Sequence, residues 1–242
     1  MSRPPLIDLF CKAGGAGTGY HRAGFRVIGV DIEPQPNYPF EFIQADAMQV
    51  LEYIADKAEP WPGAPYPAVI HASPPCQAFT QMSARWRGKG TRADTHPDLL
   101  TPTLAILRTL GIPYVVENVQ GAKHHMRPTL TLHGGQFGLG VHRPRLFECS
   151  ELILAPKMPQ TESPIGVYGT KPDGRTTYRY RNNGNYKGKS LSRAAKSIEE
   201  AREVMGIDWM TRDELAQAIP PAYTQHIGAR LLDHIGATAA AA

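Results

Sequence analysis

The stretch DLFCKAGGAGTGYHRAGF, residues 8–25, decides the fold of this 242-residue chain. A short apolar segment, predicted as a strand over Leu6–Phe10, runs into a turn with several glycines and then into a predicted helix over Gly15–Ala23. Such a turn brings the backbone close to a nucleotide-like ligand, although its spacing departs from the GxGxxG dinucleotide pattern. Taken alone, the stretch also fits a tight strand-to-helix turn without a ligand.

Short apolar runs alternate with longer amphipathic stretches over the first half of the chain. This alternation is typical of βαβ units and predicts an α/β fold with an open, doubly wound parallel sheet. In such a sheet, ligands bind at the carboxyl ends of the strands. Further strands are predicted at Arg26–Val30, Phe42–Ala45, Ala68–His71 and Tyr114–Glu117, and helices at Ala47–Lys57 and Asp98–Leu110.

The composition changes after Ser150, where Pro, Gly, Tyr and basic residues become frequent. Helical periodicity returns at Ser197–Met205, Thr211 and Glu214 form a capping box, and a last helix is predicted over Pro221–Ile235. The expected organisation is a catalytic and cofactor-binding core at 1–150, a small region at 151–195, C-terminal helices returning to the core at 196–236, and a disordered tail at 237–242.

Composition narrows the class of protein. The chain is 42% apolar and 20% charged, with a formal net charge of +4, so a globular protein that favours a polyanionic partner is expected. Its cysteines (Cys11, Cys76 and Cys149) are too scattered for a disulfide framework, and none has metal-ligand spacing. The opening MSRPPLIDLF is too short for a membrane span or a signal peptide. We therefore expect a soluble, metal-free protein in a reducing, cytoplasmic setting.

Acidic residues end two of the predicted strands. Asp31 follows the glycine turn by about 20 residues, the position from which a carboxylate accepts hydrogen bonds from a ribose diol in Rossmann-type sites. Asp46 ends the next strand, where it is placed to meet an adenine amino group. Each acid also fits a turn or a helix cap, Asp46 especially, because it directly precedes a helix.

Cys76 stands on a stiff turn, SPPC at 73–76, at the end of another strand. The sequence predicts that Glu117 lies at the same edge of the sheet, where burial raises the pKa of a carboxyl and lets it protonate a ring nitrogen. A lone Glu at this position equally fits a helix cap. Arg143 and Arg145 alternate along an extended segment and so point the same way. One guanidinium can polarise a carbonyl oxygen while the other braces the site.

These motifs together resemble the DNA (cytosine-5) methyltransferase family. They occur in the order of the family and leave only 151–195 unmatched, the region where the family places target recognition. The motifs are DLFCKAGGAG (8–17), GVDIEP (29–34), SPPCQAFT (73–80), VVENVQG (115–121), RPRLF (143–147) and IPPAYTQHIGARLL (219–232).

The resemblance implies a Rossmann-like class I methyltransferase sheet with helices on both faces, and S-adenosyl-L-methionine as the cofactor. Phe10 is expected to stack on the adenine, Asp31 to hold the ribose and Asp46 to bind the adenine amino group. The full set of implied cofactor contacts is Phe10, Ala13, Gly14, Gly15, Asp31, Ile32, Asp46 and Ser73.

The resemblance also implies a reaction on a cytosine flipped out of duplex DNA. Cys76 is expected to add to carbon 6, Glu117 to steady nitrogen 3 and Arg145 to contact oxygen 2. Arg143 is expected to support the site and Pro75 to orient the base. Addition at carbon 6 makes carbon 5 nucleophilic, so that it takes the methyl group before Cys76 is eliminated.

Two basic segments are candidates for gripping DNA. One is a glycine-containing loop with Arg85, Arg87, Lys89 and Arg92, which equally fits a solvated surface loop. The other is Lys171–Lys196, where eight basic residues face one acid and tyrosines lie between them. The terminal motif departs from the family, because His226-Ile227-Gly228-Ala229 stands where an Asn near the cofactor carboxylate is common.

Several alternatives stay open on the sequence. An RNA cytosine-5 methyltransferase shares the same catalytic residues, and an inactive nucleic-acid-binding homologue shares the fold. A small-molecule methyltransferase accounts for the cofactor site, but not for the turn that carries Cys76 together with the basic region. The expected enzyme is a monomer that binds double-stranded DNA. A restriction partner, a phage or plasmid self-protection enzyme and an orphan regulator all fit this sequence.

Overall fold

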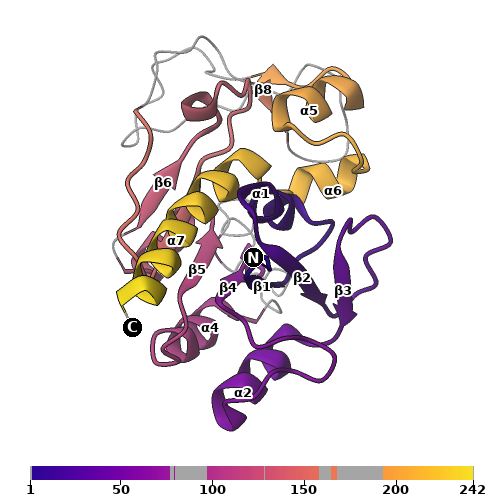
Figure 1. Cartoon of the computed structure of the whole chain (residues 1–242). Helices are drawn as coiled ribbons and strands as arrows, with labels where there is room; N and C mark the ends of the chain where they lie inside the picture. Colours follow the sequence, from indigo (N-terminus) through magenta and orange to yellow (C-terminus); the bar gives the residue numbers. More distant parts are fainter. Residues whose placement is uncertain are drawn as a thin grey trace.

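A computed structural model of the chain describes residues 2–76, 79, 97–127, 129–157, 165–167 and 193–241. Within these residues the centre of the protein is a seven-stranded sheet in the order β3-β2-β1-β4-β5-β7-β6 (Figure 1). A short parallel pair, β8-β9, lies apart from it. The order places β1 and β4, the strands before the glycine turn and before Cys76, side by side.

The elements of the sheet are β1 (Pro5–Leu9), β2 (Arg26–Asp31), β3 (Glu41–Gln44), β4 (Val69–Ala72), β5 (Tyr114–Asn118), β6 (Leu130–Leu132) and β7 (Arg145–Cys149). The helices are α1 (Gly15–Ala23), α2 (Ala47–Lys57), α4 (Leu100–Leu107), α5 (Ile198–Met205), α6 (Arg212–Gln217) and α7 (Pro221–Ala241), with the 3-10 turns η3 (Gln120–His125) and η4 (Gly134–Phe137). The separate pair is β8 (Ile165–Gly166) and β9 (Arg193–Ala194).

Side-chain alternation along β1 sends its residues into two cores. Ile7 and Leu9 pack with the buried faces of α2 and α4, whereas Leu6 packs with α1 and α7. The sheet is therefore covered on both faces, as Figure 1 shows, and the expected α/β fold is confirmed. β1 to β5 are parallel, but β7 runs antiparallel to both of its neighbours. The parallel sheet expected for the first half of the chain is thus present in β1 to β5, and β7 adds an antiparallel edge.

Helices α1 and α7 touch closely because small residues face each other. A Cβ atom added at Gly19 would lie 2.0 Å from Thr224 Oγ1 and 2.1 Å from the Pro221 carbonyl oxygen. The Thr224 hydroxyl donates a hydrogen bond of 2.8 Å to the Ala16 carbonyl. The last helix is thereby fixed against the helix that follows the glycine turn.

The ends of several helices follow their capping residues. α1 and α2 have the predicted bounds, but α4 is shorter than the predicted Asp98–Leu110. Asp98 Oδ1 accepts hydrogen bonds from the Leu100 and Thr101 N–H groups, so Asp98 lies outside the helix as a cap. Helix α6 begins with the predicted capping box of Thr211 and Glu214.

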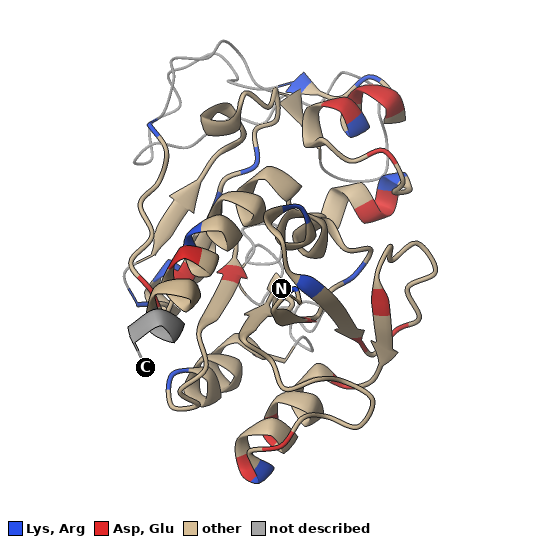
Figure 2. Cartoon of the chain, viewed as in Figure 1, with Lys and Arg blue, Asp and Glu red and all other residues tan. Residues whose placement is uncertain are grey.

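Helix α7 is longer than predicted. It continues past Ile235 to Ala241, so residues 237–241 are helical where a disordered tail was expected. The reason is that alanine has the highest helix propensity. Charged residues lie on α2, α5, α6 and α7 and also on strands such as β2 and β3 and on loops (Figure 2). Among the described helices, none has both the length and the apolar character needed to cross a bilayer. The proposed boundaries at 150 and 195 stay predictions.

Candidate active site

One cavity of about 580 Å³ lies at the carboxyl ends of the parallel strands, a volume in the usual range of small-molecule sites. It contains the predicted residues of both groups, the cofactor contacts and the catalytic residues. Gly14 alone of the predicted set does not line it. The predicted residues in its wall are Phe10, Ala13, Gly15, Asp31, Ile32, Asp46, Ser73, Pro75, Cys76, Glu117, Arg143 and Arg145.

The glycine turn holds an unusual backbone. Gly14 has a φ of 82°, and a Cβ atom there would lie 2.9 Å from Pro39 Cδ. Phe10 and Lys12 also have positive φ values, 59° and 45°, a conformation that costs a non-glycine residue about 1 kcal/mol or more. The Trp209 indole N–H donates a hydrogen bond of 3.1 Å to the Ala13 carbonyl. The turn is therefore strained locally and held from the C-terminal part of the chain.

Asp31 is buried at the end of β2, with 3% of its surface exposed. Its two carboxylate oxygens accept hydrogen bonds of 3.1 Å from the backbone N–H groups of Lys12 and Glu33. The Lys12 ammonium lies 3.5 Å from Asp31 and 3.0 Å from Glu33. This carboxylate is thus fixed before any ligand binds. Ile32 beside it is 64% exposed, a flat apolar flank at the cavity.

Asp46 combines the two roles that the sequence left open. Its side chain caps α2 by accepting a 2.8 Å hydrogen bond from the Met48 N–H. It also lines the cavity. The helix cap uses Oδ1, so a ligand amino group would donate its hydrogen bond to the remaining lone pairs of this carboxylate. Whether Asp46 binds adenine stays a prediction.

The cofactor half of the cavity fits a nucleoside with a flat base and a diol. It offers an aromatic ring at Phe10, an apolar flank at Ile32, an oriented carboxylate at Asp31, and Gly15, where a Cβ atom would lie 2.6 Å from the Ile219 carbonyl oxygen. Among the described residues, no group of three or more His, Cys, Asp or Glu side chains is arranged to hold a metal ion.

The turn that carries Cys76 is tied to the two strands beside it. The Ser73 N–H donates a hydrogen bond of 3.1 Å to the Leu9 carbonyl on β1. On the other side, the Asn118 side-chain amide donates a hydrogen bond of 3.1 Å to the Pro74 carbonyl. Neither proline of the turn has an N–H of its own, so these contacts and the fixed proline φ angles set its shape.

The Cys76 thiol differs from the other two cysteines in its electrostatic surroundings. Burial, and next the charge of Glu117, raise the pKa of Cys76, but Arg145 and Arg143 oppose this rise. At Cys149, burial and next the charges of Glu148 and Glu151 raise the pKa to about 12. Cys11 is buried and its pKa is likewise raised, mainly by desolvation. Cys76 is therefore the cysteine placed beside guanidinium groups that stabilise a thiolate.

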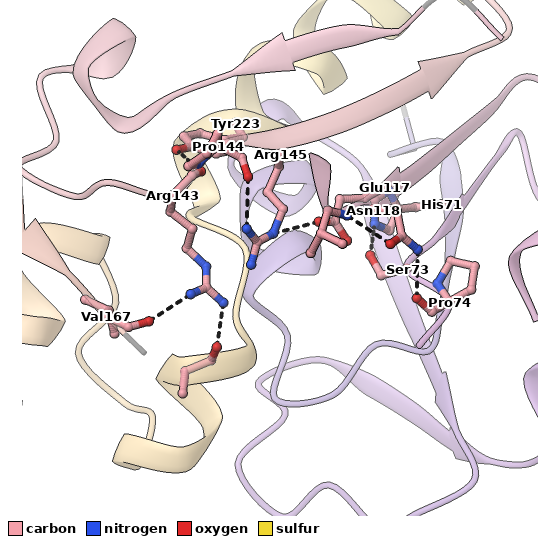
Figure 3. Close-up of polar contacts among 12 residues, drawn as sticks. His71, Ser73, Pro74, Glu117, Asn118, Arg143, Pro144, Arg145, Val167 and Tyr223 are labelled. Atoms are coloured by element: carbon pink, nitrogen blue, oxygen red, sulfur yellow. Dashed lines mark hydrogen bonds and ion pairs between the residues drawn. The ribbon is translucent and has the colours of Figure 1, made fainter. Parts of the chain in front are cut away.

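Glu117 and Arg145 form a buried ion pair (Figure 3). Arg145 Nε lies 2.9 Å from Glu117 Oε1, and the side chains are 12% and 9% exposed. Burial raises the pKa of Glu117, whereas Arg145, Arg143 and a hydrogen bond from Ser73 lower it. The net rise keeps a carboxyl available as a proton donor closer to neutral pH.

Arg143 points to the same side of its segment as Arg145 but makes different contacts (Figure 3). It is 1% exposed and donates hydrogen bonds to the carbonyl oxygens of Val167, at 2.9 Å, and Ala216, at 2.7 Å. It therefore joins β7 to the segments before α7 and after β8. These contacts suit the bracing role expected for Arg143, which stays a prediction.

Some residues of the cavity were missed by sequence reasoning. Asp8, on β1, is fully buried; neither of its oxygens makes a regular hydrogen bond within the described residues, and burial raises its pKa well above the usual value. The C-terminal part of the chain also contributes to the cavity wall, although no residue type there indicated a site. Its members are Met210, Glu214, Ala216, Gln217, Ala218 and Ile219.

The residues proposed to grip nucleic acid lie mostly outside the described residues. This holds for Arg85, Arg87, Lys89 and Arg92, and for 171–192 of the second basic segment. Arg193, at its end, pairs with Glu200. His226, in the motif that departs from the family, contacts the Leu154 carbonyl at 2.9 Å and is not part of the cavity wall.

A curated relative, the type II methyltransferase M.AgeI of Thalassovita gelatinovora, is 25% identical over 169 residues, which are 58% of this chain and 38% of that protein. The chain thus spans well under half the length of this relative.

Solved structures with the same fold include Entamoeba histolytica methyltransferase EhMeth and S. pombe Dnmt2 methyltransferase. EhMeth has a TM-score of 0.59 and 14% identity, with 97% of this chain and 99% of that chain covered. Dnmt2 has a TM-score of 0.55 and 13% identity, with the same coverage. The model of the C-5 cytosine-specific DNA methylase family matches residues 5–133, more than half of the sequence. The chain therefore belongs to the C-5 cytosine-specific DNA methylase family.

Proposed function

We propose that the protein transfers a methyl group from S-adenosyl-L-methionine to carbon 5 of a cytosine in duplex DNA, through a covalent adduct with Cys76. The observation that carries this proposal is the convergence of Cys76, Glu117 and Arg145 on the cavity that the glycine turn also lines. One part of the site suits the binding of a nucleotide-like cofactor, and the other part suits nucleophilic addition. A site with both properties is suited to a reaction between a bound cofactor and a second molecule.

The side chains divide the reaction between them. The Cys76 thiolate adds to carbon 6 of the ring, and Glu117 places a proton on nitrogen 3, which removes electron density and assists the addition. Arg145, next to Glu117, contacts oxygen 2 and stabilises the charge that develops there. S-adenosyl-L-methionine, when bound, supplies an electrophilic methyl group. Loss of the proton at carbon 5 and elimination of Cys76 then release the methylated base.

The cofactor is held by the other half of the cavity in this proposal. Asp31 accepts hydrogen bonds from the ribose hydroxyls, Phe10 and Ile32 flank the adenine, and Asp46 accepts a hydrogen bond from the adenine amino group. The target base must leave the stack to reach Cys76, at a cost of a few kcal/mol that contacts in the pocket offset. Duplex DNA is therefore the expected partner.

The test is incubation with S-adenosyl-L-methionine carrying a tritiated methyl group, with mixed-sequence duplex DNA and folded RNA in parallel reactions. Nucleoside analysis then locates the label, and bisulfite sequencing finds the target sequence. We expect label in 5-methylcytosine from DNA. Label in RNA alone assigns the RNA substrate, and cofactor binding without any transfer assigns an inactive homologue.

A further inference from the structure

Behind Glu117, polar side chains form a connected series that reaches into the core. The Tyr20 hydroxyl on α1 lies 3.0 Å from His71 Nδ1 on β4. His71 Nε2 lies 2.9 Å from Ser73 Oγ (Figure 3). Ser73 and Glu117 line the same cavity, and the Ser73 hydroxyl lowers the pKa of Glu117. We call Tyr20, His71 and Ser73 the Glu117 relay.

We propose that the Glu117 relay is a positioning device, which directs one hydrogen bond into the Glu117 carboxyl and so sets its orientation and its charge for the reaction. The inference rests on the proposed function of Glu117. It adds residues from α1 and β4 that do not touch the target base and act through Glu117.

The direction of the hydrogen bonds follows from the protonation states. His71 is fully buried, and burial lowers its pKa to about 3, so the imidazole is neutral and has one donor and one acceptor nitrogen. Burial also keeps Tyr20 protonated, because it raises the tyrosine pKa well above its usual value. Within the described residues, the Tyr20 hydroxyl contacts no acceptor other than His71 Nδ1.

Tyr20 therefore donates to Nδ1, which leaves the imidazole proton on Nε2. His71 Nε2 then donates to Ser73 Oγ, which leaves the Ser73 hydroxyl proton available to the Glu117 carboxylate, whose pKa Ser73 lowers. The opposite direction would leave the Tyr20 proton buried without an acceptor, a penalty of about 1–3 kcal/mol. The relay thus favours one tautomer of His71 and donates toward Glu117.

The relay acts together with the other charged and titratable groups that face Glu117. Arg145 holds Oε1, Arg143 adds a second positive charge, and the Cys76 thiol faces the carboxyl from the turn after β4. Burial alone raises the pKa of Glu117. The cations and the Ser73 hydroxyl bring the carboxyl back toward the balance that a proton donor needs in order to give up and regain its proton.

A packing role gives a weaker account of His71. It occupies a fully buried position of β4, between β1 and β5 in the sheet, where its neighbours Ile70 and Ala72 are apolar. Burying an imidazole there costs free energy unless its nitrogens are used. Both ring nitrogens of His71 are used, and the series ends at the proposed proton donor.

The direct test measures the Glu117 pKa in the full chain without any reaction. Protein labelled with ¹³C at the glutamate side-chain carboxyl is titrated by NMR, and the Glu117 signal is identified by its loss in Glu117→Gln. We expect Ser73→Ala to raise the pKa by about 1, as loss of a hydrogen bond to a charged group does. Tyr20→Phe should raise it by less, and Ser73→Thr, which keeps the hydroxyl, should resemble the wild type.

A second measurement tests the consequence for the reaction. The pH dependence of single-turnover methylation should move to higher pH in Ser73→Ala and, less, in Tyr20→Phe, whereas a purely structural defect lowers the rate alike at every pH. An unchanged Glu117 pKa in folded Ser73→Ala and Tyr20→Phe overturns the relay. If the pKa moves but the wild type methylates neither DNA nor RNA, the relay stands and the proposed function fails.

Discussion

The two halves of the cavity are built differently. In the cofactor half, the Asp31 carboxylate is held by backbone N–H groups, and the glycine turn is shaped by its φ angles. In the reaction half, Glu117 pairs with the Arg145 guanidinium, and the Ser73 hydroxyl lowers its pKa. One half therefore depends on the path of the chain and the other on a few polar atoms.

This difference implies that substitutions in one half should change mainly the cofactor affinity, and substitutions in the other half mainly the reaction rate. A change of one side-chain atom in the reaction half removes a chemical group that the backbone cannot replace. In the cofactor half, a conservative change leaves the backbone contacts in place, so larger losses need a change that moves the turn. The expected effects below test this division, from the largest to the smallest.

Cys76→Ser should lower the single-turnover methylation rate by about 10⁴-fold or more, because a serine hydroxyl is a much weaker nucleophile than a thiolate. The affinity for S-adenosyl-L-methionine, measured by calorimetry, should stay within about 2-fold, since the thiol lies outside the cofactor half. Cys149→Ser is the control and should retain the rate. Robust methylation by Cys76→Ser would remove the nucleophile from the proposal.

Gly19→Ala should lower the free energy of unfolding by about 3 kcal/mol, because the added methyl group meets Thr224 and the Pro221 carbonyl. Cofactor affinity should fall with it, since α1 follows the glycine turn directly. Gly236→Ala on α7 is the matched control. Nothing lies within 4 Å of its added Cβ atom, so urea denaturation should show a gain of about 0.5–1 kcal/mol. Equal effects of the two substitutions would contradict the close α1–α7 contact.

Asp31→Asn should raise the cofactor Kd about 10-fold and leave the rate at saturating cofactor within about 3-fold. The amide keeps the size of the side chain and one of the two backbone hydrogen bonds, but loses the other acceptor oxygen and the charge that favours the ribose hydroxyls. Calorimetry and single-turnover kinetics measure the two quantities. A large drop in rate with an unchanged Kd would place Asp31 in the reaction half.

Stability should depend on pH through His71. Its pKa in the folded protein, about 3, lies below the ordinary value of 6.5, so between these values the unfolded chain binds more protons. The free energy of unfolding should therefore fall as the pH is lowered through this window, with a slope that approaches about 1.4 kcal/mol per pH unit from this group. Urea denaturation at pH 7.5 and 5.5 should show a smaller difference for His71→Gln, whereas exposed His124→Gln should match the wild type.

Local signals made much of the fold predictable. The glycine turn, α1, α2 and the capping box at Thr211 depend on residues close in sequence, and the structure has them where the sequence predicts them. The antiparallel direction of β7 was not predictable in this way, because strand pairing joins Leu146 to Asn118 across a long separation in sequence.

The same distinction holds for the cavity. Cys76, Glu117 and Asp31 were predicted because each ends a strand, and strand ends meet at one edge of the sheet. The role of His71 was not predicted, because it depends on a contact with Tyr20, which lies 51 residues away in the sequence. The wall at 210–219 contains ordinary residue types, and only tertiary packing brings it to the glycine turn.

The contact of α7 with α1 also has a consequence for how the protein is made. Helix α1 leaves the ribosome well before residues 210–219 and Thr224, which complete the cavity and cover Gly19. A nascent chain that has exposed its glycine turn still lacks that wall. The cavity therefore becomes complete only after residues 210–224 have also been made, so shorter nascent chains do not carry the finished site.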